Sequence, residues 1–238
     1  MPIIKIVALM SIVLLSYSSL ALQLNPSSYQ LAPKGSLATH VFEVVNDSNE
    51  IIAIKASIVT REWIGNKEHN NTTTQFEIFP AQLILKPQEK KGVRVRWAGD
   101  KTIQVEQAFR LIVEQLPVNF TQEQQVSGMK VLHKVVGALY VTPNNLKPQL
   151  AFDKVQKIID AQKGPLLVFD VTNNGGVHSL LNKHHIVVQG HNRLVLAPEW
   201  FGKLPTQNVL AGSVLTVELP WPKALTITPQ KPLIVSEP

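Results

Sequence analysis

The chain has 238 residues, of which 45% are hydrophobic and 17% charged, and its formal net charge is +6. It contains no cysteine, which excludes disulfides, thiol catalysis, iron–sulfur clusters and cysteine zinc sites. The modest positive charge favours solubility without specifying a partner, and the length is sufficient for one large or two small hydrophobic cores.

The first 21 residues predict a secretory signal peptide. Lys5 precedes an apolar run that ends in small residues, with Ser19 and Ala21 at the positions where a signal peptidase prefers them. The run is too short and too interrupted by serines to favour a membrane span. We therefore expect an exported protein with no stable membrane insertion, whose net charge falls from +6 to +5 when residues 1–21 leave with one lysine.

The next hundred residues predict strands and turns almost throughout. The segments rich in β-branched and aromatic residues are 40–47, 51–63, 93–97 and 107–117. Residues 66–74 are polar and predict a loop. Pro80 and Pro87 break 76–92 into short or edge strands, because proline cannot donate a hydrogen bond to a sheet.

A long strand is expected over residues 128–143, "GMKVLHKVVGALYVTP", directly after a glutamine-rich segment. Its two-residue period places one set of side chains on each face. The first set is Met129, Val131, His133 and Val135, and the second is Lys130, Leu132, Lys134 and Val136. So much apolar surface beside a polar segment raises the question of whether part of this strand serves another protein.

The composition of the sequence changes after Pro143. Residues 143–149 carry two prolines and two asparagines and predict a linker, which a second β-rich segment follows. We therefore expect an all-β protein with two immunoglobulin-like β-sandwich domains, 22–143 and 144–238. The strongest helical candidate is 154–162, whose sequence is equally compatible with a strand.

Motifs for catalysis or cofactor binding are not evident, so we expect no enzyme activity and no cofactor. Four histidines lie close in sequence, but they lack the spacing of known zinc motifs and are expected at loops and strand edges: His178, His184, His185 and His191. The basic run 90–97 alternates with Val93, Val95 and Trp97, which predicts a half-buried strand rather than a nucleic-acid patch.

Several stretches in order resemble the PapD-like periplasmic chaperones of the chaperone–usher pathway. They include "LQLNPSSYQLAPKGS" (22–36), "VVNDSNEIIAIKASI" (44–58), "IFPAQLILKPQEKKGVRV" (78–95), "EQAFRLIVEQLP" (106–117) and "GALYVTP" (137–143). In the second half, "VTNNGGVHSLL" (171–181) and "VLAGSVLTVELPWP" (209–222) resemble the archaic branch of the family. The resemblance covers nearly the whole chain after residue 21.

The resemblance implies a periplasmic chaperone that binds pilus or fimbrial subunits and delivers them to an outer-membrane usher. It does so by donor-strand complementation, in which the chaperone supplies the strand that a subunit sandwich lacks. Alignment on Pro143 places Met129, Val131, His133 and Val135 at the family's donor positions. His133 suits an apolar pocket poorly, and a one-residue shift would exchange the two faces of the strand.

Two departures from the family concern the site that grips the subunit's C-terminal carboxylate. The family has an arginine in its first strand and a lysine near the end of its donor strand, where this chain has Ser28 or Tyr29, and Ala138. Neither replacement supplies a positive charge. The candidate replacements for this carboxylate anchor are Lys134, Arg110 and Arg61, each of which is individually more typical of an ordinary surface cation.

The family also has a charged cluster between its domains. Arg94 and Glu106 match its arginine and glutamate, so the resemblance implies a structural role for both. The acidic partner usually found in the second domain has no clear match.

Other interpretations of the sequence remain open. An exported two-domain β adhesin or carbohydrate-binding protein would need exposed aromatic platforms, and the candidate side chains are Trp63, Trp97, Trp200 and Trp221. An exported metal-binding protein would use the histidines, and a hydrolase is least favoured. The subunit, the usher and any self-association of the free form through its apolar strand are not specified by the sequence.

Overall fold

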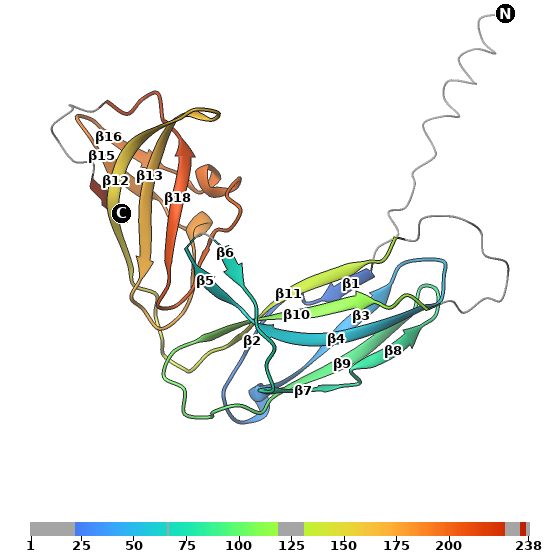
Figure 1. The fold of residues 1–238 in the computed structure, drawn as a ribbon. Coiled ribbons are helices and arrows are strands. Elements are labelled where there is room, and N and C mark those ends of the chain that lie inside the picture. Colours follow the sequence, from blue (N-terminus) through green and yellow to red (C-terminus); the bar gives the residue numbers. More distant parts are fainter. Residues whose placement is uncertain (1–21, 66, 119–130, 227–233, 237–238) are drawn as a thin grey trace, which may run out of the picture.

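The computed structural model describes residues 22–65, 67–118, 131–226 and 234–236. Its regular structure is almost entirely strand, arranged in two groups that meet at one end and enclose an angle (Figure 1). This confirms the predicted all-β class with two sandwiches. Within the described ranges, no helix has the length and apolar character needed to cross a bilayer. The predicted signal peptide, 1–21, lies outside the described residues.

The first group is a sandwich of two facing sheets. One sheet has the order β1-β3-β9-β7 and contains β1 (Leu22–Asn25), β3 (Thr39–Asn46), β9 (Lys90–Trp97) and β7 (Phe76–Phe79). The other, which we call the cleft sheet, has the order β2-β11-β10-β4-β8. It contains β2 (Ser28–Leu31), β11 (Lys134–Val141), β10 (Gln107–Gln115), β4 (Ile52–Thr60) and β8 (Gln82–Leu85). The short 3-10 helix η1 (Ser36–Ala38) precedes β3.

Alternation along the strands explains the core between these two sheets. In β9 the side chains of Val93, Val95 and Trp97 are buried while those of Arg94 and Arg96 are exposed, as the sequence predicts. Phe42 and Phe109 are also fully buried in this core. Burying an aliphatic or aromatic side chain of this size contributes about 1.5–3 kcal/mol, so this layer stabilises the first sandwich of a chain without disulfides.

The second group has its own core and three smaller sheets. The largest contains β12 (Leu150–Asp160), β13 (Gly164–Asn173) and β18 (Val214–Pro220). The others pair β16 (Arg193–Leu196), β15 (Ile186–Gln189) and β19 (Ile234–Ser236), and β14 (Ser179–Leu180) with β17 (Asn208–Val209). The 3-10 helices η2 (Leu181–Lys183) and η3 (Pro198–Phe201) complete the group, whose core includes Phe169, Val188 and Phe201.

The helical interpretation of residues 154–162 is wrong. Most of this segment belongs to β12, which pairs along its length with the apolar strand β13 and contains an irregularity between Asp153 and Gln156. Lys154 adopts a positive φ of 51° there. Pairing with a neighbouring buried strand overrides the weak helical propensity of the segment.

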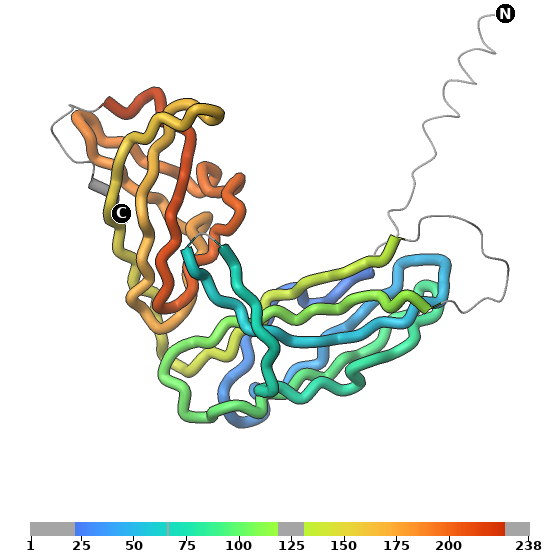
Figure 2. The backbone as a smooth tube through the Cα atoms, in the orientation of Figure 1, coloured from blue at the N-terminus to red at the C-terminus, as the bar shows by residue number. Residues whose placement is uncertain are grey.

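A hairpin between β4 and β7 was not expected from the polar sequence of residues 66–74. It consists of β5 (Glu62–Ile64) and β6 (Lys67–His69), which pair only with each other in a separate two-stranded sheet. The hairpin rises from the end of β4 into the angle between the two groups (Figures 1 and 2). Trp63 lines a cleft with Leu204 and Thr206 of the second group, so the hairpin faces that group.

Candidate functional site

The strand β11 has an open edge over its first half. Its C-terminal half, Ala138–Val141, pairs with β2, whereas Lys134–Gly137 pairs only with β10 among the described residues. The strand is shorter than the predicted 128–143, because pairing with β10 ends at Lys134, and residues 131–133 lie outside any strand. Residues 128–130 are not among the described residues.

The backbone amide and carbonyl groups of successive residues in β11 point to opposite sides of the strand. The amide of Ala138 donates to Ser27, on the side away from β10, and the carbonyl of His133 accepts from Gln115, the last residue of β10. Since hydrogen-bonding direction alternates along an antiparallel strand, the amides and carbonyls of Lys134 and Val136 point out of the open edge. An edge of this kind can receive another strand.

The side chains at this edge differ in exposure. Val135 packs partly against the core of its own sandwich, together with the buried Leu139. Val131, Leu132 and Val136 are exposed, with fractions of 63%, 42% and 46%. Of the predicted donor residues, Val131 and His133 are therefore exposed, Val135 is partly buried in its own domain, and Met129 lies outside the described residues.

The register of the cleft sheet locates the expected anchor positions. Ala138 is paired with Ser28 on one side and with Arg110 on the other, so these three side chains form one row across β2, β11 and β10. The residue opposite Ala138 is therefore Ser28 rather than Tyr29. Directly paired residues have Cβ atoms about 5 Å apart. Arg110 therefore places a positive charge beside Ala138, one of the two uncharged positions of the row.

Lys134 lies on the same face but further along the strand. Four residues separate it from Ala138, which corresponds to about 13 Å in an extended strand. It is paired with Glu114 of β10 and is exposed. The register thus favours Arg110 over Lys134 as the cation beside Ala138.

Arg61 and Arg110 converge on one carboxylate. The Nε and Nη2 atoms of Arg110 donate to the two oxygens of Glu68 at 2.8 and 2.5 Å, and Nε of Arg61 donates to Oε2 at 3.0 Å. The Arg61 side chain is only 4% exposed, and those of Glu68 and Arg110 are each 21% exposed. We call these three residues the Arg–Glu–Arg cluster.

Electrostatics keep the carboxylate of this cluster ionised. Burial raises the pKa of Glu68, but hydrogen bonds and positive charge from Arg110 and Arg61 outweigh that effect, so the pKa lies below its ordinary value. Two guanidinium groups and one carboxylate leave the cluster with a net positive charge at neutral pH. Such a cluster suits a second anion or an exchange of one carboxylate for another.

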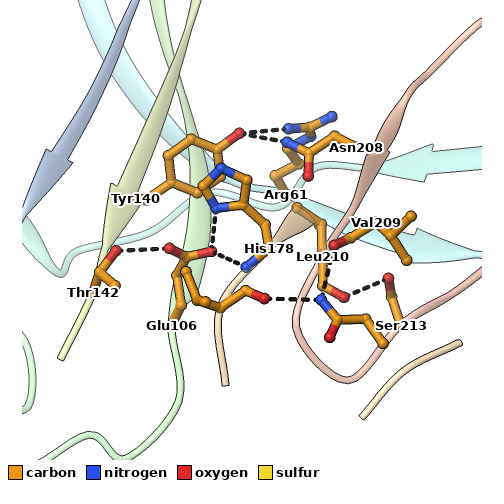
Figure 3. A network of polar contacts seen from close by, with 11 residues as sticks. Arg61, Glu106, Tyr140, Thr142, His178, Asn208, Val209, Leu210 and Ser213 are labelled. Atoms are coloured by element: carbon orange, nitrogen blue, oxygen red, sulfur yellow. Dashed lines mark hydrogen bonds and ion pairs between the residues drawn. The ribbon is translucent and has the colours of Figure 1, made fainter. Parts of the chain in front are cut away.

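A polar network joins the two sandwiches next to this cluster (Figure 3). Glu106, whose side chain is 1% exposed, accepts hydrogen bonds from the amide of His178 at 3.0 Å and from the Thr142 hydroxyl at 2.7 Å. Its Oε1 atom also lies 2.7 Å from Nδ1 of His178. The His178 ring stacks on Tyr140 with centroids 4.1 Å apart and an interplanar angle of 12°.

Tyr140 connects this network to the Arg–Glu–Arg cluster. Its hydroxyl accepts hydrogen bonds from Nη1 of Arg61 at 3.2 Å and from Nδ2 of Asn208 at 2.7 Å (Figure 3). Burial raises the pKa of the Tyr140 phenol, so the hydroxyl stays neutral under ordinary conditions. A buried cation from the first sandwich and an amide from the second thus share one acceptor.

The expected place of Arg94 in an interdomain charged cluster with Glu106 needs correction. Arg94 lies on the exposed face of β9, where its guanidinium is 5.8 Å from the centre of the Phe79 ring. The reason is the strand period, which directs Arg94 and Arg96 outward when Val95 faces the core. His178 takes the place beside Glu106 that the sequence assigned to an arginine.

The four histidines do not form a metal site in the described part of the chain. His178 contacts Glu106, and Nε2 of His184 lies 2.7 Å from the Ser179 hydroxyl. Nowhere in the described ranges do three histidine or acidic side chains gather closely enough to hold a metal ion. The tryptophans also form no shared platform, since Trp97 is buried and Trp221 lies beneath Lys157.

A family model described as pili and flagellar-assembly chaperone, PapD N-terminal domain, matches residues 23–147 of the chain. The chain belongs to this family of pilus-assembly chaperones. No curated protein matches the sequence. The match ends shortly before Leu150, where β12 begins, and the predicted domain boundary at residue 144 stays a prediction.

Solved structures of pilus chaperones have the same fold. The class 5 fimbriae chaperone CfaA is 14% identical, with a TM-score of 0.58 over 91% of this chain and 98% of its own. A chain from the CsuC–CsuE chaperone–tip adhesion subunit complex of archaic Csu pili, from Acinetobacter baumannii, is 13% identical. Its TM-score is 0.55 over 83% of this chain and 89% of its own. The E. coli chaperone DraB is 14% identical, with a TM-score of 0.54 and 86% coverage of both chains.

Three residues of the site could not be identified from the sequence. Glu68 lies in a stretch that predicts a polar loop, and His178 and Asn208 come from the second sandwich, far from Glu106 and Tyr140 in sequence. In the sequence, Glu68 is an acidic residue that lies between Arg61 and Arg110. Such an arrangement is too common to identify a site.

Proposed function

We propose that this protein is a periplasmic chaperone that binds pilus or fimbrial subunits by donor-strand complementation and passes them to an outer-membrane usher. The observation that carries the proposal is the open edge of β11, whose backbone groups at Lys134 and Val136 point outward beside the exposed side chain of Val131. Strand addition at such an edge supplies main-chain hydrogen bonds for affinity and side-chain pockets for specificity. The activity needs no bond to be made or broken.

Related structures support this partner class. One is the CsuC–CsuE chaperone–tip adhesion subunit pre-assembly complex, and another is the SafA pilin of Salmonella enterica in complex with the SafB chaperone. Both chaperones share the fold of this chain at low identity. The inference that this chain also binds a subunit rests on family membership together with its own open edge.

Within the donor segment we assign the plug role to Met129, Val131 and His133, with Val135 at the boundary. Val131 has the most exposed apolar side chain of the described part of the segment. Val135 is partly committed to its own core, so it would contact the subunit only where the two sheets join.

For the carboxylate anchor we propose Arg110 with Arg61 in support. Arg110 is paired with Ala138, where the family's lysine would stand, and Arg61 shares its carboxylate partner. A planar guanidinium matches a carboxylate with two parallel hydrogen bonds, so it can replace the family's lysine.

Co-purification with a tagged pilus subunit tests the strand assignment. We expect the double variant Met129→Asp, Val131→Asp to fold and to lose subunit capture, because carboxylates cannot enter apolar pockets. Ile159→Asp is the matched control, since Ile159 is 72% exposed on β12, in the second sandwich. Normal capture by the double variant would contradict the assignment.

A further inference from the structure

We propose that Glu68 acts as an internal substitute for the subunit's C-terminal carboxylate, occupying Arg61 and Arg110 in the free chaperone and leaving when a subunit binds. This inference rests on the proposed function, because the incoming ligand is the carboxylate of a bound subunit. It assigns the β5–β6 hairpin a role as a latch over the anchor.

The hydrogen-bond geometry makes Glu68 resemble a bound ligand. It accepts two parallel bonds from the Nε and Nη2 edge of Arg110 and a third bond from Arg61. That edge of the guanidinium holds one carboxylate in this bidentate arrangement, so a second carboxylate can take the same place only if Glu68 leaves. The exchange conserves charge, because one carboxylate replaces another beside two arginines.

The position of the cluster fits the path of an incoming strand. Arg110 belongs to the row that contains Ala138 and Ser28, next to the open half of β11. A strand added to the open edge can therefore bring its terminal carboxylate towards this row. Arg61, whose side chain is 4% exposed, forms the inner wall and is held by the Tyr140 hydroxyl at 3.2 Å.

The hairpin that carries Glu68 is a small element of the fold. Its strands contain three residues each, and a two-stranded ribbon of this size has little stability by itself. Near its base the described contacts include the bridge between Val59 and Thr72, the hydrogen bonds between Thr60 and Asn71, and the bond from the Arg61 amide to the Ala108 carbonyl. Displacement of Glu68 thus requires movement of a small element. Arg110 is held within β10, and Arg61, which lies between β4 and β5, is held by its backbone amide bond to Ala108 of β10.

The first experiment uses acetate as the probe and NMR signals of the Arg61 and Arg110 Nε–H groups as the readout. In Glu68→Gln, we expect both signals to titrate with acetate at a concentration about tenfold or more below that needed for the unmodified protein, because a charged competitor is removed. Glu62→Gln is the matched control, since Glu62 is exposed on the other strand of the same hairpin. Equal acetate responses in all three proteins would overturn the latch.

The second experiment uses the tagged subunit with its natural C-terminus and the same subunit extended by Gly-Ser. We expect Glu68→Gln to capture the natural subunit with about tenfold higher affinity than the unmodified chaperone, and to show no gain for the extended subunit. An equal gain for both subunits, or weaker capture of the natural one, would overturn the latch. Either result would leave strand binding intact, because loss of capture in the Met129→Asp, Val131→Asp variant reports on that separately.

Discussion

At the residue scale, the site depends on a few buried polar groups that are satisfied across the junction of the two sandwiches. Glu106 accepts hydrogen bonds from His178 and Thr142, and Tyr140 accepts from Arg61 and Asn208. In surroundings of low polarity, loss of one of these hydrogen bonds lowers the free energy of unfolding, because an unsatisfied donor would remain buried. These residues are therefore expected to set the geometry in which the Arg–Glu–Arg cluster faces the cleft.

Replacing Glu106 by alanine should lower the free energy of unfolding by about 1–3 kcal/mol, because the Thr142 hydroxyl and the His178 amide lose their buried acceptor. Urea denaturation of the purified protein measures the change. Glu77→Ala is the control, since Glu77 pairs with Arg96 on an exposed face and should have little effect. Equal destabilisation by both substitutions would show that the Glu106 network contributes no more than a surface pair.

At the element scale, strands with apolar alternation were predictable and the polar hairpin was not. The alternation of Val93, Val95 and Trp97 defines β9 because one face of that strand must be buried. Residues 66–74 carry no such period, and the hairpin is tied to the sheet by the bonds of Glu68 with Arg110, which is distant in sequence. The end of β11 at Lys134 was equally unpredictable, because it depends on where β10 stops pairing.

The stabilising effect of the hairpin contact should depend on pH. The pKa of Glu68 is lowered in the folded protein, so the contact stabilises fully above the unfolded carboxyl value of about 4.3 and is lost as pH falls through the folded value. We expect the unmodified protein to be more stable than Glu68→Gln at pH 7. The difference should shrink towards zero in acid, as measured by urea denaturation from pH 7 to pH 3. A difference that does not change with pH would contradict an ionised Glu68.

At the scale of the whole molecule, two sandwiches with separate cores meet through a polar junction rather than an apolar one. The fold class was predictable from the order of strand and turn segments, and the family from the resemblance of several sequence stretches. The junction was not, because its partners are distant in sequence and Arg94 faces away from it. A cleft of about 510 Å³ lies between the sandwiches, with Arg61, Glu106 and Ser213 in its lining.

Removing the His178 ring should loosen the angle between the sandwiches. His178→Ala loses the stack on Tyr140 and one contact with Glu106 while the backbone bond remains. Small-angle X-ray scattering should show a broader distribution of interatomic distances than for the unmodified protein. His191→Ala removes an exposed histidine of the same sandwich and should leave the distribution unchanged. If the distribution of interatomic distances is unchanged in His178→Ala, contacts other than the His178 ring set the angle between the sandwiches.

Amide hydrogen exchange measures directly whether a subunit adds a strand to the open edge of β11. The amide of Val136 points out of that edge, whereas the amide of Val135 points towards β10, with which this part of β11 pairs. In a complex with a pilus subunit, we predict that exchange at Val136 slows at least about tenfold while exchange at Val135 changes little. A stable complex in which Val136 exchanges as fast as in the free protein would contradict donor-strand complementation at this edge.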